Sequence, residues 1–519
     1  SNGGYNHATG GGGGTQSAGG ARGTGNQNNG TAGSLGQGGA GGGSGREGGG
    51  GGGGYYGGGG GGSSPSGGGG GGGGGSNYIL SGASSVTQTR GGGATYNAHG
   101  SLSITYTASS TEYGDIVING DLKAGAGVAS NSNRGSTVST EGDLTIAGDA
   151  SIKDGITADS ITNNGIMRWT VNAGNLTTSH QISGSGKLFK YGSSNLTLSN
   201  SQSYTGDTEI YSGTLINNST LSDSTDLILT GGNYTTNATD TVASISTSNA
   251  SSTLTIASSQ ILTTSTSSDT TFAGIIAGSG GFKKAGSGTL TLSGTNTYTG
   301  GTDITAGGIL ITNDRNLGAV PGSADADNVI IRNGATLATG NANVTMAANR
   351  GFNVPSGTAK LLKYTRKSWT LNNPISGSGG VNFDDSTASG GNGGGGGRYY
   401  LKVANTYTGD TLISFRGTRD PGVVVDHNNA FQNTTVDFNN TNIPNANETS
   451  EPLLWFRTTA PVLGGLKGDR DLINEQSFTA NAVLNIGNNN EDTTFSGRIR
   501  DGQRTYGIKK IGTGSLTLT

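Results

Sequence analysis

The strongest constraint on the fold is an internal repeat. Residues 182–216 (ISGSGKLFKYGSSNLTLSNSQSYTGDTEIYSGTLI) and residues 276–310 (IAGSGGFKKAGSGTLTLSGTNTYTGGTDITAGGIL) match without a gap, at a constant offset of 94 residues (276 minus 182). A third copy spans residues 375–418 and is interrupted by the insert SGGNGGGGG. A fourth copy covers residues 492–519 and is truncated in mid-motif. A chain that writes one pattern four times is expected to fold as stacked repeats of one structural unit.

Aligned positions of the copies carry the same residue types, and we expect them to be structural rather than catalytic. The repeat positions are Leu196, Leu198, Tyr204 and Gly206 in the first copy, Leu290, Leu292, Tyr298 and Gly300 in the second, Tyr407 and Gly409 in the third, and Leu516 and Leu518 in the fourth.

Polarity alternates with a period of two inside each copy. In the run T-L-T-L at residues 289–292, the leucines face one side and the threonines the other, which is typical of a half-buried strand. Thr, Ile, Val and Tyr dominate such runs, and Gly, Asn, Ser and Asp fill the gaps between them. Short strands with frequent turns predict an all-β fold.

Among all-β folds, a sandwich, a propeller and a solenoid are the alternatives, and the brief strands and small turns favour a β-solenoid. In a solenoid each strand pairs with its equivalents about 4.8 Å away, so like residues stack on like. Coils of about 20 to 25 residues would give about twenty coils and a rod on the order of 90 to 100 Å long. We expect N-terminal coils in residues 78–181 and repeat-bearing coils in residues 182–519.

Composition excludes several classes of function. The net charge is -3 and 12% of residues are charged, so no basic field exists to attract nucleic acid or an anionic membrane. Cysteine is absent, which removes disulfides, thiolate metal sites and cysteine nucleophiles. No window is apolar enough to span a bilayer as a helix. The start lacks a Met and a signal peptide and the last repeat is cut short, so we expect a portion of a longer protein.

The repeat resembles a known family. GSGGFKKAGSGTLTLSGTNTYTGGTDITAGGIL, residues 278–310, is similar to the passenger-associated transport repeat of autotransporter-type surface proteins of Gram-negative bacteria. NLGAVPGSADADNVIIRNGATLATG, from Asn316, and APVLGGLKGDRDL, from Ala460, are similar to sequences that commonly follow this repeat. The resemblance implies a right-handed parallel β-helix that is secreted through the outer membrane and displayed outside the cell. It also implies that the repeat helps the passenger fold and move outward and has no catalytic role.

The first part of the chain, residues 1–77, is a glycine-rich module. It contains the runs Gly48–Gly54, Gly57–Gly62 and Gly67–Gly75. Composition alone indicates a flexible linker, because glycine has the most conformational freedom to lose. Extended polyglycine helices can nevertheless pack side by side and pair their backbone groups. The pattern resembles the glycine-rich regions of anaplastic lymphoma kinase-type receptors and of some phage tail adhesins, and we expect this packed, polyglycine-II form.

Four pairs of acidic residues are the best candidates for catalysis, because glycoside cleavage needs two carboxylates about 5 to 10 Å apart. The pairs are Asp325 with Asp327, Asp384 with Asp385, Asp469 with Asp471, and Glu491 with Asp492. Each has Gly, Asn or Ser nearby, where Asp commonly bonds its own backbone, so we interpret them as turn residues. We predict no catalytic, cofactor-binding or metal-binding residue.

The histidines and tryptophans also do not indicate a functional site. The histidines His7, His99, His180 and His427 are far apart without metal-ligand spacing. Asp426 beside His427 does not predict a dyad, since neighbours on a strand point to opposite faces. Aromatic residues can form sugar platforms, but the apolar or β-branched neighbours of Trp169, Trp369 and Trp455 favour core positions.

Taken together, these features predict a non-enzymatic extracellular protein, a rigid β-solenoid stalk with structural and adhesive roles at a Gram-negative cell surface, associated with the outer membrane. One alternative is a subunit of a self-assembling filament or sheath, with the glycine-rich module as the contact. A second is a polysaccharide-degrading β-helix enzyme. Expected partners are further repeats or copies of the chain, and a surface glycan or host-cell ligand. No cofactor is expected.

Overall fold

The computed structural model describes residues 160–172, 174–364, 366–385, 397–415, 422–438, 454–474 and 480–519. It also describes residues 21, 22, 24, 32 and 40, and the backbone of eight short strands before residue 160. Most of the glycine-rich module lies outside the described residues, and its polyglycine packing stays a prediction.

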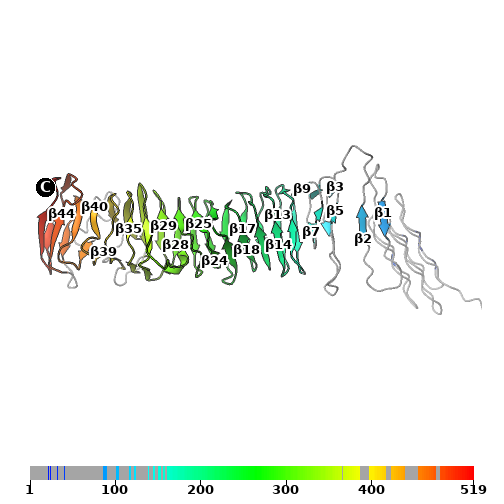
Figure 1. Cartoon of the computed structure of the whole chain (residues 1–519), viewed down its shortest axis with the longest axis horizontal. Helices are drawn as coiled ribbons and strands as arrows, with labels where there is room; N and C mark the ends of the chain where they lie inside the picture. The colour runs from blue at the N-terminus through cyan, green and yellow to red at the C-terminus, as the bar shows by residue number, and fades with distance from the viewer. Residues whose placement is uncertain are drawn as a thin grey trace, which may run out of the picture. The chain divides into compact units, whose positions relative to one another are not determined.

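The chain divides into two compact units, Ser1–Tyr113 and Gly114–Thr519. In the first unit, strand β1 (Val86–Thr89) pairs with β2 (Ser101–Ile104) in antiparallel fashion. The described strands of the second unit pair in parallel, each with a strand of a neighbouring coil (Figure 1). The domain boundary expected at residue 78 stays a prediction.

Three sheets form the earlier coils of the second unit. The first sheet contains β4 (Leu122–Lys123), β7 (Ala150–Ile152), β10 (Ile166–Thr170), β13 (Lys187–Tyr191), β15 (Thr208–Ile210), β17 (Asp226–Leu229) and β20 (Ser244–Ser246). The second contains β11 (Leu176–Thr178), β14 (Asn195–Leu198), β16 (Thr214–Asn217), β18 (Asn233–Thr236), β21 (Thr253–Ile256) and β24 (Ile275–Gly278). The third contains β3 (Ile116–Ile118), β6 (Leu144–Ile146), β9 (Ile161–Asn163) and β12 (Ile182–Ser183).

Three further sheets form the later coils. The fourth sheet contains β19 (Asp240–Val242), β22 (Ile261–Thr264), β25 (Gly281–Lys284), β27 (Thr302–Ile304), β29 (Asp325–Ile331), β32 (Arg350–Asn353) and β35 (Ile375–Ser376). The fifth contains β23 (Thr270–Phe272), β26 (Thr289–Leu292), β28 (Gly308–Ile311), β30 (Thr336–Thr339), β33 (Thr358–Lys363), β36 (Gly380–Asp385), β38 (Thr411–Ser414), β40 (Phe431–Phe438), β42 (Val462–Gly468), β44 (Ala482–Ile486), β45 (Thr493–Phe495), β47 (Tyr506–Lys510) and β48 (Leu516–Leu518). The sixth contains β31 (Val344–Met346), β34 (Trp369–Leu371), β37 (Arg398–Leu401), β39 (Gly422–Val425) and β41 (Leu454–Phe456).

Two strand pairs and one helical turn complete the described elements. The pairs are β5 (Val138–Ser139) with β8 (Ile156–Thr157), and β43 (Leu472–Asn474) with β46 (Ile499–Asp501). Helical structure within the described residues is limited to one 3-10 turn, η1 (Asp314–Leu317).

The core is a stack of aliphatic and aromatic side chains, one level per coil. Leu196 is in register with Leu215, which is in register with Tyr234 and, one coil further, with Leu254. All four side chains are fully buried. Burial of a Leu side chain stabilises a fold by about 1.5 to 3 kcal/mol. Each coil that stacks on its neighbours therefore adds a similar increment to the stability of the solenoid. Polar residues take many of the alternate, outward positions, such as Asn195 and Thr197 in β14 and Thr214 in β16, which explains how a chain with 30% hydrophobic residues has a continuous core.

The parallel β-solenoid expected from the sequence is confirmed, with about 14 turns. The expectation of about twenty coils assumed short coils throughout residues 78–519. Coils are short where the connections between strands are short, as between Leu196 and its parallel partner Leu215 (215 minus 196, 19 residues). They lengthen where loops are inserted, as between Ile304 and Ile331 (331 minus 304, 27 residues), where η1 occupies the connection.

Candidate functional site

The candidate site is the connection between two successive strands of the repeat, because the sequences of the copies agree most closely there. In the second copy, the segment N-T-Y-T-G lies between β26 and β27 and forms no strand. Backbone bonds still join this segment to the coil before it, as from the nitrogen of Thr297 to the carbonyl oxygen of Ile276 (2.8 Å). The side chain of Asn296 adds two more: its Oδ1 accepts from the backbone nitrogen of Ile276 (2.8 Å), and its Nδ2 donates to the carbonyl oxygen of Asn316 (2.5 Å). One buried amide therefore links the coil before it to the coil after it.

The first and third copies repeat this contact. The backbone nitrogen of Ile182 donates to Oε1 of Gln202 (2.8 Å), and that of Ile375 donates to Oδ1 of Asn405 (2.8 Å). The alignment places Gln202, Asn296 and Asn405 at one repeat position, although the sequence alone does not show that their side chains bridge coils.

A buried tyrosine fixes the same segment from inside the core. The backbone nitrogen of Tyr298 donates to the carbonyl oxygen of Ile276 (3.3 Å), and its hydroxyl pairs with that of Thr302 (2.6 Å). Burial raises the pKa of Tyr298 to about 12, so the phenol stays protonated and able to donate. Equivalent hydroxyl pairs join Tyr204 to Thr208 (2.5 Å) and Tyr407 to Thr411 (2.6 Å).

The repeat glycines mark close approaches between coils. A Cβ added at Gly300 would lie 2.4 Å from the carbonyl carbon of Gly280. A Cβ at Gly206 would lie 2.4 Å from the carbonyl oxygen of Gly186, and one at Gly409 would lie 2.4 Å from the backbone nitrogen of Gly380. Contacts this short exclude any side chain, so successive backbones can pack here only through glycine.

The repeat leucines lie in the core, apart from those of the fourth copy. Leu196, Leu198, Leu290 and Leu292 are fully buried. Leu516 is partly buried against the core and Leu518 is 54% exposed, although both pair in register with β45.

A buried lysine recurs in the repeat and was missed by the sequence analysis. Nζ of Lys190 donates to the carbonyl oxygens of Tyr191 (2.7 Å), Gly192 (2.9 Å) and Ser212 (3.1 Å), and its side chain is fully buried. Burial lowers the pKa of Lys190 to about 8. Lys284 and Lys510 cap the equivalent turns. The signal in the sequence is K-x-G, found as KYG, KAG and KIG.

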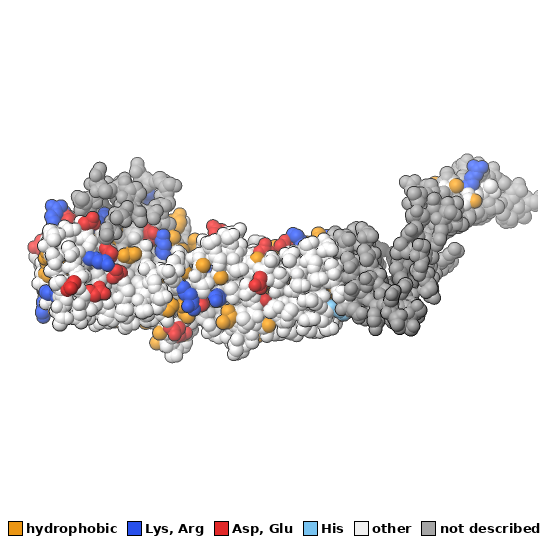
Figure 2. Space-filling view, turned by 90° about the horizontal axis from the view of Figure 1, so that it is seen from above, with side chains coloured by type: hydrophobic (Ala, Val, Ile, Leu, Met, Phe, Trp, Pro, Cys, Tyr) orange, Lys and Arg blue, Asp and Glu red, His pale blue; other side chains and the backbone are white. Residues whose placement is uncertain are grey.

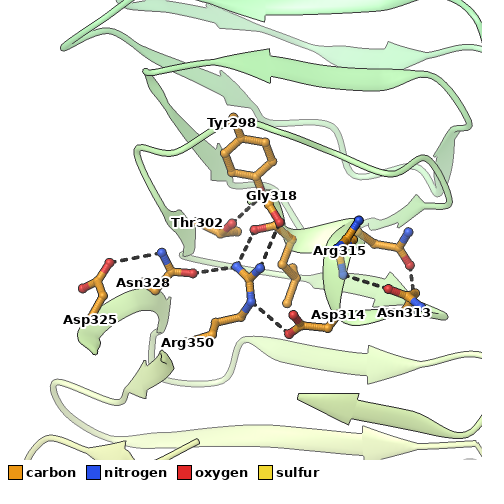
Figure 3. Close-up of polar contacts among 11 residues, drawn as sticks. Tyr298, Thr302, Asn313, Asp314, Arg315, Gly318, Asp325, Asn328 and Arg350 are labelled. Carbon is orange, nitrogen blue, oxygen red and sulfur yellow. Dashed lines mark hydrogen bonds and ion pairs between the residues drawn. The ribbon is translucent and has the colours of Figure 1, made fainter. Parts of the chain in front are cut away.

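The turn that follows the second copy is held by a buried arginine (Figure 3). Arg350 is fully buried, and its Nε donates to Oδ1 of Asp314 at 2.9 Å. Its two terminal nitrogens donate to the carbonyl oxygens of Leu317 (2.8 Å) and Gly318 (2.9 Å), and one also donates to Oδ1 of Asn328 (2.6 Å). The guanidinium therefore caps the end of η1 and fastens the longer connection to the coil that follows it.

Two of the acidic pairs differ from the interpretation as turn residues. Asp384 and Asp385 end strand β36 and are buried, so a turn is wrong for this pair. Asp384 pairs with Lys360 (2.8 Å), and Asp385 faces Lys363 (3.9 Å). Asp325 begins β29, where its Oδ2 accepts from Asn328 (3.1 Å).

Four further acidic side chains of these pairs are engaged in structural contacts. Asp327 accepts from Asn353 (2.7 Å), and Asp471 pairs with Arg498 (2.9 Å). Glu491 accepts from Thr435 (2.7 Å), and Asp492 accepts from the backbone nitrogen of Ser515 (2.7 Å). Such contacts fix coils and turns and do not resemble a pair of carboxylates converging on one groove.

The described histidines, His180 and His427, form no dyad. Nδ1 of His180 pairs with the hydroxyl of Thr178 (3.0 Å), and Nδ1 of His427 accepts from the backbone nitrogen of Asn429 (3.1 Å). The neighbouring Asp426 is bound by Arg457 and Lys402; these bonds outweigh burial and lower its pKa. His7 and His99 lie outside the described residues.

The described part of the chain offers no group of three His, Cys, Asp or Glu residues that could hold a metal ion. Among the same residues no helix is long and apolar enough to cross a bilayer. The core positions expected for Trp169 and Trp369 are confirmed, since both are fully buried within the hydrophobic core. Trp455 is also fully buried, but it lies outside this core cluster, with the guanidinium of Arg398 over its ring at 4.8 Å.

An aromatic cluster lies on the outward side of the first sheet. Along β13, Leu188 and Lys190 point into the core, so Phe189 and Tyr191 point outward. Tyr191 stacks on Tyr211 of the next coil, with ring centroids 4.5 Å apart, and Tyr211 also contacts Phe189 edge to face at 5.6 Å. Tyr191 and Tyr211 keep part of their surface exposed.

Charge is unevenly distributed over the solenoid. Figure 2 shows fewer charged side chains over the earlier coils and a denser mixture of both signs over the C-terminal coils. Several of these charges form pairs between coils, such as Lys467 with Asp410 at 2.6 Å. A mixed surface of this kind supports no long-range attraction for a polyanion.

Comparison with known proteins agrees with the repeat geometry. Residues 188–216 and 282–311 match the family model described as passenger-associated-transport-repeat. The chain is 32% identical over 287 residues to the adhesin BmaC autotransporter of Brucella suis biovar 1 (strain 1330). The match covers 50% of this chain and 8% of that relative, so the chain spans a small part of the relative's length. No solved structure matches. Both matches support an autotransporter-type passenger repeat protein, as the sequence resemblance implied.

Proposed function

We propose that this chain is part of a non-enzymatic adhesive surface protein, in which the solenoid is a rigid stalk displayed outside a Gram-negative cell. The observation that carries the proposal is the parallel pairing of successive described coils, which is reinforced in three copies of the repeat by the side chains of Gln202, Asn296 and Asn405. The similarity to a protein named an adhesin and to a passenger-associated repeat supports the location and the role.

The solenoid suits a stalk because its coils are linked along the axis by backbone hydrogen bonds. With about 14 turns spaced about 4.8 Å apart, the described coils would span roughly 65 Å. Each coil contacts only its neighbours, so the structure can grow coil by coil as the chain emerges at the surface. This mode of folding needs no energy source outside the cell.

The outward aromatic cluster of Phe189, Tyr191 and Tyr211 is our candidate for a contact with a surface ligand. Aromatic rings beside charged groups favour glycans, because sugar C–H faces pack on rings while hydroxyls bond the charges. Glu209, which accepts from the hydroxyl of Tyr211 (2.7 Å), and Lys187, paired with Asp207, supply such charges. A host-cell or bacterial glycan is therefore the expected partner.

Adhesion is tested by displaying the chain on a non-adherent Gram-negative strain and measuring attachment to epithelial monolayers and to a glycan array. We expect attachment above that of cells that display only the anchor. Replacement of Tyr191 and Tyr211 together by Ser should reduce attachment several-fold without altering display. Equal attachment of cells with and without the chain would contradict an adhesive role.

The polysaccharide-degrading enzyme is the alternative that the acidic pairs suggested. Four carboxylates of these pairs are bound by a lysine, an arginine, an amide or a backbone nitrogen (Asp384, Asp471, Asp325 and Asp492), which supports the non-enzymatic proposal. Incubation of the purified chain with surface polysaccharides, followed by chromatography of the soluble fraction, tests it. Release of oligosaccharide that is lost in an Asp471→Asn variant would favour the enzyme. Neither comparison favours the filament or sheath.

A further inference from the structure

A lysine and an aspartate face one another inside the core, on two successive coils. Lys363 ends β33 and Asp385 ends β36, and the two residues are direct cross-strand partners in the parallel ladder. Their side chains are 1% and 2% exposed. The partner positions of Leu361 and Phe383, two residues earlier, are also buried, so this side of the ladder faces the core.

The contact between these side chains is not that of a well-formed ion pair. Nζ of Lys363 lies 3.9 Å from Oδ2 of Asp385, and it has no hydrogen-bond partner. Charged lysine–carboxylate bonds close to about 2.7 to 2.9 Å, and an ammonium carries three N–H donors that need acceptors. A buried ammonium without an acceptor is far more costly than a neutral nitrogen with a single N–H.

Neighbouring groups on the outward side of the same two strands behave differently. Lys360 and Asp384 close to 2.8 Å, and Lys360 keeps 34% of its side chain exposed. The two strands can therefore form an ordinary ion pair where water is present. Lys363 and Asp385 are the same two residue types as Lys360 and Asp384, so the longer distance between them is due to their buried surroundings.

Aromatic rings enclose the inward pair. The ring of Phe415 lies 5.5 Å from Nζ of Lys363, and Tyr399 packs against both Phe415 (5.9 Å) and Phe383 (5.0 Å). The hydroxyl of Tyr399 donates to the carbonyl oxygens of Leu361 (2.7 Å) and Asp384 (2.8 Å). Burial lowers the pKa of Lys363 to about 8, although the charges of Asp385 and Asp384 oppose this. At a given pH, a larger fraction of Lys363 is therefore in the neutral, nucleophilic form than of an exposed lysine.

We propose that Lys363 and Asp385 form an intramolecular isopeptide bond. The ammonium of Lys363 first transfers a proton to the carboxylate of Asp385, which gives a neutral amine and a carboxylic acid. The amine nitrogen attacks Cγ of Asp385, a C–N bond forms, and a C–O bond breaks. The hydroxyl leaves with a proton from nitrogen as one water molecule. No oxidant, reductant or other reactant is needed.

The bond would tie β33 to β36 where the chain leaves the sheet. The sequence that follows Asp385 leads into the glycine-rich insert SGGNGGGGG, which contains no apolar side chain. A covalent link between the coils at this point would keep the ladder closed under a pull along the axis. The inference goes beyond the adhesive function and is independent of which ligand the stalk binds.

Intact-mass spectrometry of the full chain under denaturing conditions tests the proposal. We expect a mass lower than that of the sequence by one water molecule. We also expect a proteolytic fragment in which the peptide with Lys363 is joined to the peptide with Asp385. A mass equal to that of the sequence would overturn the proposal. So would a loss of water that maps to any other residue, such as an aspartate cyclised onto its own backbone.

Variants separate the link from folding. Asp385→Ala and Lys363→Met should each restore the full mass, whether or not they destabilise the protein. Lys360→Arg changes the neighbouring outward lysine and should keep the loss of water. If Lys360→Arg abolishes it while Lys363→Met does not, the assignment to Lys363 is wrong.

Discussion

The hydroxyl oxygen of Tyr298 lies 2.6 Å from that of Thr302, four residues further along the chain, and both side chains are buried. The same pairing recurs in two other copies of the repeat. A hydroxyl pair in an apolar core stabilises little by itself, but each hydroxyl is costly when its partner is lost. The Y-x-x-x-T spacing of the repeat is therefore explained by the pairing of these two side chains in the core and does not indicate a contact with an external ligand.

Tyr298→Phe should destabilise the solenoid by about 1 to 2 kcal/mol, because the hydroxyl of Thr302 would be buried without this partner. Thr302→Val should cost a similar amount. The double variant should cost less than the sum of the two, since it removes both polar groups together. Urea unfolding, followed by tryptophan fluorescence, gives the free energy of unfolding of the wild type, of both single variants and of the double variant. Strictly additive costs would show that the two hydroxyls do not stabilise each other.

Gly300→Ala should be far more damaging than its size suggests. The added Cβ would lie 2.4 Å from the backbone of Gly280, and backbone atoms on both sides cannot move without breaking the ladder. We expect a loss of roughly 3 kcal/mol or more, of the size seen for overpacked cores. Gly322→Ala is the matched control, because no atom lies within 4 Å of its added Cβ. Thermal unfolding of the two variants should differ clearly, and equal midpoints would argue against the close approach.

Lys190→Met should destabilise the first copy by about 2 to 3 kcal/mol, because three carbonyl oxygens would lose a buried charged donor. The control is Lys510→Met, which removes the equivalent contact where the side chain is exposed and water can replace it. Its cost should stay below about 0.5 kcal/mol. Chemical denaturation gives both values. Equal costs at the two positions would mean that burial of Lys190 contributes nothing.

Local alternation and the repeat predicted much of the architecture. The leucines of the T-L-T-L runs identified the inward face, because alternate residues of a strand point to opposite faces and only one face can be buried. The buried lysines had a local signal, K-x-G, but a lysine in a polar chain is normally solvated, so composition argued against them.

Contacts between distant residues could not be predicted in the same way. Arg350 and Asp314 are 36 residues apart, and their meeting depends on how a lengthened coil closes. Asp384 and Asp385 have serine and glycine soon after them, which suggested a turn. The strand in fact continues to Asp385 because its neighbour β33 is equally long and supplies a partner for each residue. Pairing partners in a solenoid are set by coil length, which local sequence does not specify.

Arg350→Met should loosen the turn that holds η1. Substitution removes four hydrogen bonds at a buried site and leaves Asp314 without its cation, which typically costs 3 to 5 kcal/mol, about as much as breaking a buried pair. Arg332→Met is the control: its pair with Asp303 is half exposed and should contribute less than about 1 kcal/mol. Limited proteolysis should cut residues 313–328 sooner in Arg350→Met alone. Unchanged cleavage would contradict the clamp.

The buried carboxyl of Asp240 should make stability fall as the pH rises through weakly acidic values. Burial raises the pKa of Asp240 from 3.8 to about 6, although Leu221 and Thr241 donate backbone bonds to it. Because the folded state holds this proton more tightly than the unfolded chain, the stabilisation is complete below about pH 4 and is lost as the pH passes about 6. The full change should be about 3 kcal/mol, because a shift from 3.8 to about 6 is about two pKa units and each unit is worth 1.36 kcal/mol.

Unfolding free energies of the wild type and of Asp240→Asn, measured between about pH 4 and about pH 6.5, test this dependence, since the variant has no proton to lose. Its profile should be flatter over that window. Asp223→Asn removes an exposed neighbouring charge that adds to the raised pKa of Asp240, so it should reduce the slope less than Asp240→Asn does. Parallel profiles for the wild type and Asp240→Asn would assign the dependence to another group. A steeper fall in the wild type than in Asp240→Asn would instead identify this buried carboxyl as the reason that the coils around β19 hold together best in mild acid.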